Sequence, residues 1–183
     1  MLLDPFAALL SSYEPSDARE RAFLARMQSL ASSAAAFDRN SFVPGHFTAS
    51  AFVVDPKTHS LLLILHRKLG LWLQPGGHID PGDDRAERAA RREVQEETGI
   101  GALSPLFGNP GIFDVDIHTI PAQKSEPGHE HFDVRFAFVA DDPALRASDE
   151  VAGARWVPLS ELPTLTSDES VLRAARKLLS LGA

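Results

Sequence analysis

The sequence predicts an α/β fold in which helices flank a mixed β-sheet, preceded by an N-terminal helical hairpin. In the first 40 residues, apolar side chains recur at intervals of three and four, as they do in amphipathic helices. The middle of the chain contains short runs rich in Val, Ile, Leu and Phe, bounded by turn residues, which are typical of strands. One helical segment interrupts these runs and another closes the chain, which is the element order of an α/β sandwich.

The N-terminal segment is expected to form two short helices, because Pro15 stops the first and Asp17 can cap the second. Turn residues at Pro44 and Gly45 separate this segment from the rest of the chain. We therefore predict a helical extension over residues 1–40 and a main domain over residues 45–183. The extension is open to three roles: capping a pocket, forming a homodimer contact or covering the sheet.

The elements of the main domain are predicted from the two periodicities of strands and helices. Gly99 comes directly after the central helix and is the residue best able to adopt the left-handed conformation that ends one. The expected strands are Thr48–Asp55, Ser60–His66, Leu71–Gln74, Phe113–Ile120, Phe132–Ala140 and Arg155–Pro158, and the expected helices are Asp84–Thr98 and Asp168–Leu181.

Composition excludes several classes of function. The 183 residues carry 18 Lys and Arg against 25 Asp and Glu, a net charge of −7, which disfavours binding of a nucleic-acid polymer through its phosphates. The longest apolar runs, Leu61–Leu65 and Phe136–Ala140, are far short of the roughly 20 residues needed to cross a bilayer, so no membrane partner is expected. The N-terminus lacks the basic start of a secretory signal, which predicts a cytoplasmic protein. Without cysteine, any metal must be held by oxygen or imidazole ligands.

The expected helix Asp84–Thr98 places three glutamates beside its apolar face. At 100° per residue, Glu97 lies about 20° and Glu93 about 60° from Ala90, whereas Glu96 lies about 120° away. Carboxylates crowded at a buried face repel one another and lose hydration unless a cation lies between them. Oxygen ligands on a partly open face suit Mg²⁺ or Mn²⁺, which share their remaining positions with substrate phosphates. The apolar stripe itself is Ala86, Ala89, Ala90 and Val94.

The alternative interpretation is a solvated helix face with pairs such as Arg92 with Glu96. It is weaker here because Glu93 and Glu97 lie on the apolar side. In addition, Gly76 and Gly77 precede the helix and let backbone approach the acids without a Cβ.

The chain reads Gly-His-Ile-Asp-Pro-Gly-Asp at 77–83 and Arg-Glu-Val-Gln-Glu-Glu-Thr-Gly-Ile at 92–100. The second run matches every fixed position of Gx5Ex7REUxEExGU, where U is a bulky apolar residue. Over Gly77–Ile100 the chain therefore resembles the Nudix box. In the first half Asp83 stands where glutamate is usual, and the spacing to Arg92 is one residue longer than in the family pattern. We expect the extra residue in the loop before the helix, where insertions are tolerated.

The resemblance implies a Nudix-like α/β/α sandwich and a pyrophosphohydrolase. Such an enzyme cleaves a diphosphate linkage in a nucleoside diphosphate derivative or related small metabolite, with Mg²⁺ or Mn²⁺ as cofactor. It also implies that Glu96 and Glu97 are the chief metal ligands and that the carbonyl of Gly76 completes the set. Glu93 is implied as a further ligand or as the base that orients the attacking water. Arg92 is implied to hold the glutamates in place through a charge-assisted bond.

The resemblance also implies another acid beyond the box, and Glu150 is the first choice, both as metal ligand and in catalysis. A comparable acid commonly precedes the tryptophan that Trp156 represents here. Asp149 is its rival. Weaker candidates are Glu126, Glu130 and Asp133, because loop acids are usually solvated.

Arg67, Arg135 and His118 are candidates for substrate binding. The arginines offer the bidentate fork that suits phosphate, although each is also consistent with a surface charge. The histidines after the box are able to contact phosphate or, with Asp133, to bind zinc, but their spacing matches no tight metal pattern. These histidines are His118, His129 and His131.

A second function stays open: a non-catalytic Nudix domain that binds a nucleotide-like effector for regulation. Such domains often lose glutamates of the box, whereas this chain retains Glu93, Glu96 and Glu97. Diphosphate isomerisation on the same fold is disfavoured because it uses a cysteine acid. The substrate itself is expected to be selected by loops such as Pro105–Gly111 and Pro121–His131.

Overall fold

The computed structural model describes residues 3–123, 126–146, 148–166 and 168–182. These residues form a mixed α/β fold with a mixed sheet, so the predicted fold class is confirmed. The chain divides into two compact units. The first unit comprises Met1–Ser50, Gly77–Ala90 and Gly111–Phe136, and the second comprises Ala51–Gly76, Arg91–Pro110 and Ala137–Ala183. The predicted boundary between 1–40 and 45–183 stays a prediction.

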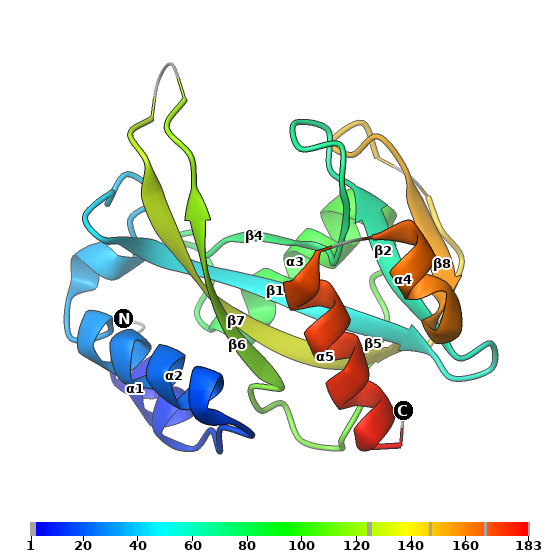
Figure 1. Ribbon diagram of the computed structural model, residues 1–183, viewed down its shortest axis with the longest axis horizontal. Helices are drawn as coiled ribbons and strands as arrows, with labels where there is room; N and C mark the ends of the chain where they lie inside the picture. The colour runs from blue at the N-terminus through cyan, green and yellow to red at the C-terminus, as the bar shows by residue number, and fades with distance from the viewer. Residues whose placement is uncertain (1–2, 124–125, 147, 167, 183) are drawn as a thin grey trace. The chain divides into compact units, whose positions relative to one another are not determined.

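The helices and strands are arranged along the chain as an N-terminal helical pair, a strand-rich middle and a C-terminal helix (Figure 1). The α-helices are α1 Leu3–Ser11, α2 Ala18–Leu30, α3 Ala86–Thr98, α4 Leu162–Leu165 and α5 Glu169–Ser180, with 3₁₀ turns at Ala34–Phe37 and Leu159–Glu161. The strands are β1 Gly45–Asp55, β2 Ser60–Leu65, β3 Trp72–Leu73, β4 Gly76–His78, β5 Leu103–Pro105, β6 Asp114–Ile120, β7 His129–Ala140 and β8 Ala154–Pro158.

The strands form one sheet in the order β3-β2-β1-β7-β5, while β4 pairs with β1, β6 with β7 and β8 with β2. The antiparallel ladder of β6 and β7 pairs Asp114 with Arg135 and continues to Ile120 opposite His129. Strand β7 therefore begins three residues before the expected Phe132, and His129 and His131 lie in the strand. Residues 124 and 125 of the expected loop Pro121–His131 lie outside the described residues.

The N-terminal hairpin packs within the first unit. Asp17 caps α2 by accepting a hydrogen bond of 2.8 Å from the backbone N–H of Glu20, as the sequence predicts. The carboxylate of Glu20 accepts a hydrogen bond of 2.6 Å from the Tyr13 hydroxyl, which ties the turn to the helix. Helices α1 and α2 lie side by side, and α2 contacts β6 (Figure 1). Of the three roles open to the extension, covering the sheet is the one that these contacts support.

Aromatic rings link the hairpin to β1. The ring of Phe6 lies 5.0 Å from that of Phe37 and 4.6 Å from that of Phe47, in edge-to-face geometry. Phe47 in turn lies 6.0 Å from Phe132 on β7. Edge-to-face pairs at these separations stabilise a core beyond the area that they bury.

In the second unit, α5 is amphipathic as expected and begins at a capping aspartate. Asp168 accepts hydrogen bonds of 2.9 and 3.1 Å from the N–H groups of Ser170 and Val171. Trp156 of β8 donates its indole N–H to the carbonyl of Pro143 at 2.9 Å. The inward face of α5 consists of Val171, Ala174, Ala175 and Leu178.

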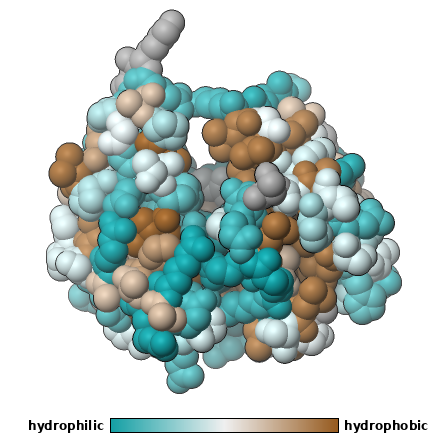
Figure 2. All heavy atoms as spheres, viewed as in Figure 1, coloured by the Kyte–Doolittle hydropathy of each residue, from teal (hydrophilic) through white to brown (hydrophobic). Residues whose placement is uncertain are grey.

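No helix in the part of the chain that the structure describes is long and apolar enough to span a membrane. Figure 2 shows hydrophobic residues in separate patches among hydrophilic ones on the visible face. The exposed large hydrophobic side chains are Val43, Leu69, Leu71, Phe107, Leu179 and Leu181.

Gly45 allows an unusually close approach between the starts of β1 and β7. A Cβ at this position would lie 1.7 Å from the carbonyl oxygen of Glu130, whose N–H donates to Pro44 at 2.9 Å. We expect G45A to lower the free energy of unfolding by at least about 2 kcal/mol, because the backbones must move apart. Urea denaturation measures this change.

The control for this substitution is G111A, since a Cβ at Gly111 would meet no atom within 4 Å among the described residues. It should stay within about 0.5 kcal/mol of the unsubstituted chain. Equal stabilities for G45A and G111A would contradict the close approach.

Candidate functional site

The three glutamates of α3 are graded in exposure as the helical angles predict. The side chain of Glu93 is 15% exposed and that of Glu96 is 43% exposed, while residue Glu97 is 8% exposed. The predicted apolar stripe is fully buried, which fixes the face that α3 turns inward. Glu97 therefore lies furthest into the protein, and Glu96 reaches solvent.

Arg92 and Gly76 hold these carboxylates. Nη1 of Arg92 donates to Glu93 at 2.9 Å and to Glu96 at 2.8 Å. The backbone N–H of Gly76, on β4, donates to Oε2 of Glu97 at 3.1 Å. Charge-assisted bonds of this kind fix the direction of a carboxylate as well as its position.

The environment of Glu97 disfavours its charge. Burial raises the pKa of Glu97 to about 8, and the hydrogen bond from Gly76 only partly opposes this rise. The negative charges of Glu93, Glu150 and Glu96 raise it further. We refer to Glu93, Glu96, Glu97 and Glu150 as the glutamate cluster. Glu97 therefore needs a nearby cation if it is to be ionised at neutral pH.

Glu150 comes from a different part of the second unit. It is exposed in a turn, where its N–H donates to the hydroxyl of Ser148 at 3.3 Å. Its charge nonetheless acts on Glu97, which lies on α3. The rival Asp149 is exposed in the same turn.

The departure from the family pattern falls in the turn before α3. Oδ2 of Asp83 accepts a hydrogen bond of 2.9 Å from the N–H of Asp80, and its own N–H donates to the Asp80 carbonyl at 2.8 Å. Asp83 is buried in this turn, and α3 begins only at Ala86. The extra residue therefore precedes the helix and leaves the spacing of its glutamates unchanged. At the other end, Gly99 takes a φ of 76° and its N–H donates to Gln95 at 2.9 Å, which ends α3 as expected.

The predicted substrate-binding residues lie in three different environments. Arg67 is exposed after β2, so its guanidinium is accessible to an anion. His118 is half-exposed on β6, with Nδ1 at 3.3 Å from Oδ2 of Asp116. Arg135 is 1% exposed, which favours a structural role over phosphate binding.

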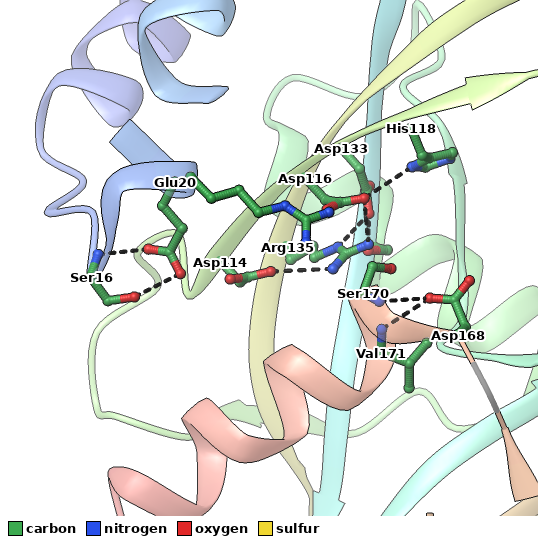
Figure 3. A network of polar contacts seen from close by, with 12 residues as sticks. Ser16, Glu20, Asp114, Asp116, His118, Asp133, Arg135, Asp168, Ser170 and Val171 are labelled. Atoms are coloured by element: carbon green, nitrogen blue, oxygen red, sulfur yellow. Dashed lines mark hydrogen bonds and ion pairs between the residues drawn. The ribbon is translucent and has the colours of Figure 1, made fainter. Parts of the chain in front are cut away.

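Arg135 lies among three aspartates of β6 and β7 (Figure 3). Its guanidinium lies 2.8 Å from Asp133, 3.2 Å from Asp114 and 3.4 Å from Asp116. Burial alone would lower the pKa of Arg135, but the three negative charges outweigh it and raise this pKa above its usual value. Asp133, a weaker candidate for the site, also accepts hydrogen bonds from Thr48 and Ser50.

The first unit also contains a cluster of histidines that the sequence prediction missed in part. His46 of β1 and His78 of β4 join the three histidines expected after the box, so five of the seven histidines are in ring contact. The period of two relates His129 to His131 on one strand face. The sequence holds no comparable signal for His46, because its neighbours depend on which strand lies beside β1.

The NUDIX domain family matches residues 44–178, which includes the glutamate cluster and the strands on both sides of α3. The chain belongs to the Nudix hydrolase family. This confirms the resemblance and the predicted class of enzyme, because the curated relatives carry the names of pyrophosphohydrolases and diphosphatases.

Two curated relatives and one solved structure illustrate the family. A Bacillus subtilis (strain 168) protein, provisionally named 8-oxo-dGTP diphosphatase, is 34% identical over 119 residues, which cover 64% of this Nudix chain and 70% of that protein. The RNA pyrophosphohydrolase of Afipia carboxidovorans is 33% identical over 107 residues, covering 52% of this chain but only 63% of that protein. A C. elegans Ap4A hydrolase binary complex superposes with a TM-score of 0.59 over 74% of this chain and 96% of that one, and its 19% identity shows the fold alone.

The raised pKa of Glu97 predicts a pH-dependent stability of this Nudix chain without metal. The pKa of Glu97 is about 8 in the folded chain and 4.5 ordinarily. Glu97 therefore makes its full contribution to the free energy of unfolding below pH 4.5, and this contribution is lost as the pH rises to 8. E97Q removes the titration. The free energy of unfolding is measured by urea denaturation in EDTA at pH 5 and pH 8. From pH 5 to pH 8, we expect the value for E97Q to rise relative to that of the unsubstituted chain by about 1 kcal/mol or more.

Glu87, on the first turn of the same helix, supplies the matched control. E87Q removes one carboxylate from the same helix outside the glutamate cluster and is measured at the same two pH values. If E97Q behaves as E87Q does, then Glu97 is ionised and adequately solvated in the folded protein.

Proposed function

We propose that this Nudix chain hydrolyses a diphosphate linkage in a nucleoside diphosphate derivative or related small molecule, with Mg²⁺ or Mn²⁺ at the glutamate cluster. The observation that supports this most directly is the buried position of Glu97 among three other acids. Such an arrangement is unfavourable in the isolated protein but suits a divalent cation. The names of the relatives, which include a diphosphatase and an RNA pyrophosphohydrolase, support the same reaction class.

The donor set fits Mg²⁺ or Mn²⁺. The cluster offers carboxylate oxygens and no sulfur or nitrogen ligand, and its partly exposed side at Glu96 leaves room for water and phosphate oxygens. Glu96 and Glu97 would be the chief ligands, with Glu150 and the carbonyl of Gly76 beside them. When bound, the ion offsets the charge of the diphosphate and lowers the pKa of water.

The remaining roles belong to the chain's own side chains. Water attacks phosphorus, the bridging P–O bond breaks, and the proton that the water loses passes to a carboxylate. Glu93 would take this role or serve as a further ligand, and the bond from Arg92 and its partly exposed carboxylate support this. Arg92 positions both Glu93 and Glu96 without itself reacting. Arg67, which is exposed, would contact the anionic substrate.

A panel of substrates tests the proposal. It comprises 8-oxo-dGTP, Ap4A, other nucleoside diphosphate derivatives and a 5′-phosphorylated RNA, each with and without Mg²⁺ or Mn²⁺. We expect at least one small molecule to be hydrolysed only with metal, and E96Q to lower kcat by at least about 100-fold, equivalent to roughly 2.7 kcal/mol. At saturating Mg²⁺, E150Q should also lose turnover, whereas the neighbouring D149N should not.

Three outcomes would change the assignment. Full turnover by E150Q would remove Glu150 from the site. Hydrolysis of the RNA and of no small molecule would assign RNA as the substrate. This would contradict the expectation, drawn from the net charge of −7, that the chain does not bind a nucleic-acid polymer. Tight binding of a nucleotide without turnover of any compound would favour the regulatory domain. The cytoplasmic location and a homodimer stay predictions.

A further inference from the structure

Three histidines of the first unit bring their ring nitrogens together. His46 comes from β1, and His129 and His131 come from one face of β7, because alternate residues of a strand share a face. The ligand atoms of the three side chains all lie within 4.8 Å of one another. Strands β1 and β7 are neighbours in the sheet, and Gly45 approaches Glu130 closely where they begin. We refer to His46, His129 and His131 as the imidazole cluster.

Backbone carbonyls define which nitrogen of two rings carries the proton. Nδ1 of His46 lies 3.1 Å from the carbonyl oxygen of Ser41, and Nδ1 of His129 lies 2.9 Å from that of Pro127. A carbonyl only accepts hydrogen bonds, so each Nδ1 is the donor and each Nε2 presents a lone pair. Histidines that bind metals are oriented in this way, with the second nitrogen donating to a carbonyl or carboxylate.

Nε2 of His46 is buried and faces no hydrogen-bond donor in the part of the chain that the structure describes. His46 is 1% exposed, and Nε2 has no hydrogen-bond partner among the described residues. A buried acceptor without a partner is destabilising. The simplest alternative is a hydrogen bond between Nε2 of His129 and Nε2 of His131, which lie 3.3 Å apart. That bond would satisfy His129 and His131 but leaves His46 unexplained.

Burial favours the neutral form of two of the three rings, which is the form that binds a metal. Burial lowers the pKa of His131 to about 2 and also lowers that of His46. Neighbouring imidazoles contribute to both shifts. Protons therefore compete little with a metal for His46 and His131 at neutral pH.

We propose that the imidazole cluster binds one divalent transition-metal ion, of which Zn²⁺ fits best, independently of the glutamate cluster. Imidazole ligands suit Zn²⁺, Cu²⁺ or Ni²⁺ and do not suit Mg²⁺. Zn–N bonds of about 2.0–2.1 Å in a tetrahedral site place two nitrogens about 3.3–3.4 Å apart, the separation that His129 and His131 already have. The ring of His78 lies 5.1 Å from that of His46, beside the imidazole cluster.

A zinc titration of the full chain tests the site. The protein is stripped with EDTA, desalted, and titrated with Zn²⁺ against a chromophoric zinc indicator, in excess Mg²⁺ so that the carboxylates are saturated. We expect one Zn²⁺ per chain. H46Q and H131Q should each weaken Zn²⁺ binding by at least about 100-fold. Loss of a group that only supports a ligand weakens metal binding by at most about this factor.

Two variants serve as controls. H59N replaces an exposed histidine in a turn, and asparagine tolerates the φ of 49° at this position. E97Q removes a carboxylate of the glutamate cluster. Both should bind Zn²⁺ as the unsubstituted chain does. Loss of zinc binding in E97Q would assign the ion to the glutamates and overturn the proposal.

Co²⁺ substitution in the unsubstituted chain makes the test independent of how the variants fold. Visible absorption typical of tetrahedral Co²⁺ with nitrogen ligands, at one equivalent and in excess Mg²⁺, supports the site. Absence of stoichiometric Zn²⁺ or Co²⁺ uptake, or unchanged affinity in folded H46Q and H131Q, would overturn it. Because the readout is metal uptake, its failure is distinct from failure to hydrolyse a diphosphate.

Discussion

Burial of the Glu97 carboxylate beside other acids is the constraint around which the candidate site is organised. Glu97 shares the buried side of the helix with Val94, and three other acids act on it. The neighbouring positive group, Arg92, bonds to Glu93 and Glu96, while the hydrogen bond that Glu97 receives within the described part of the chain comes from a backbone N–H. No positive group among the described residues compensates its charge, and the proposed divalent ion would do so.

The local structure keeps those acids in place from both ends of the helix. The turn closed by Asp80 and Asp83 precedes α3, and Gly99 ends it in a left-handed conformation. Strand β4 supplies the N–H of Gly76 at the level of Glu97. A helix fixed in this way holds carboxylates together that would separate if it frayed. The insertion in the turn shows why a change of loop length is compatible with the same glutamate spacing.

The sequence was sufficient for the features that depend on periodicity. The 3.6-residue repeat placed Glu97 and Glu93 on the buried side and Glu96 towards solvent, and the structure agrees. It was insufficient where position depends on which strands are neighbours. His46 meets His129 and His131 because Gly45 lets two backbones approach, and no repeat in the sequence records that contact. Strands β4 and β5 were missed because three residues are too few to show a period.

Binding of Mn²⁺, followed by the electron paramagnetic resonance signal of the free ion, distinguishes a metal site from a cluster of acids that stays partly protonated. We predict that the metal-free chain takes up Mn²⁺ stoichiometrically and that a double variant, E96Q with E97Q, folds but takes up none. A chain that leaves all Mn²⁺ free in solution, or a folded double variant that binds it unchanged, would contradict a metal site at the glutamate cluster.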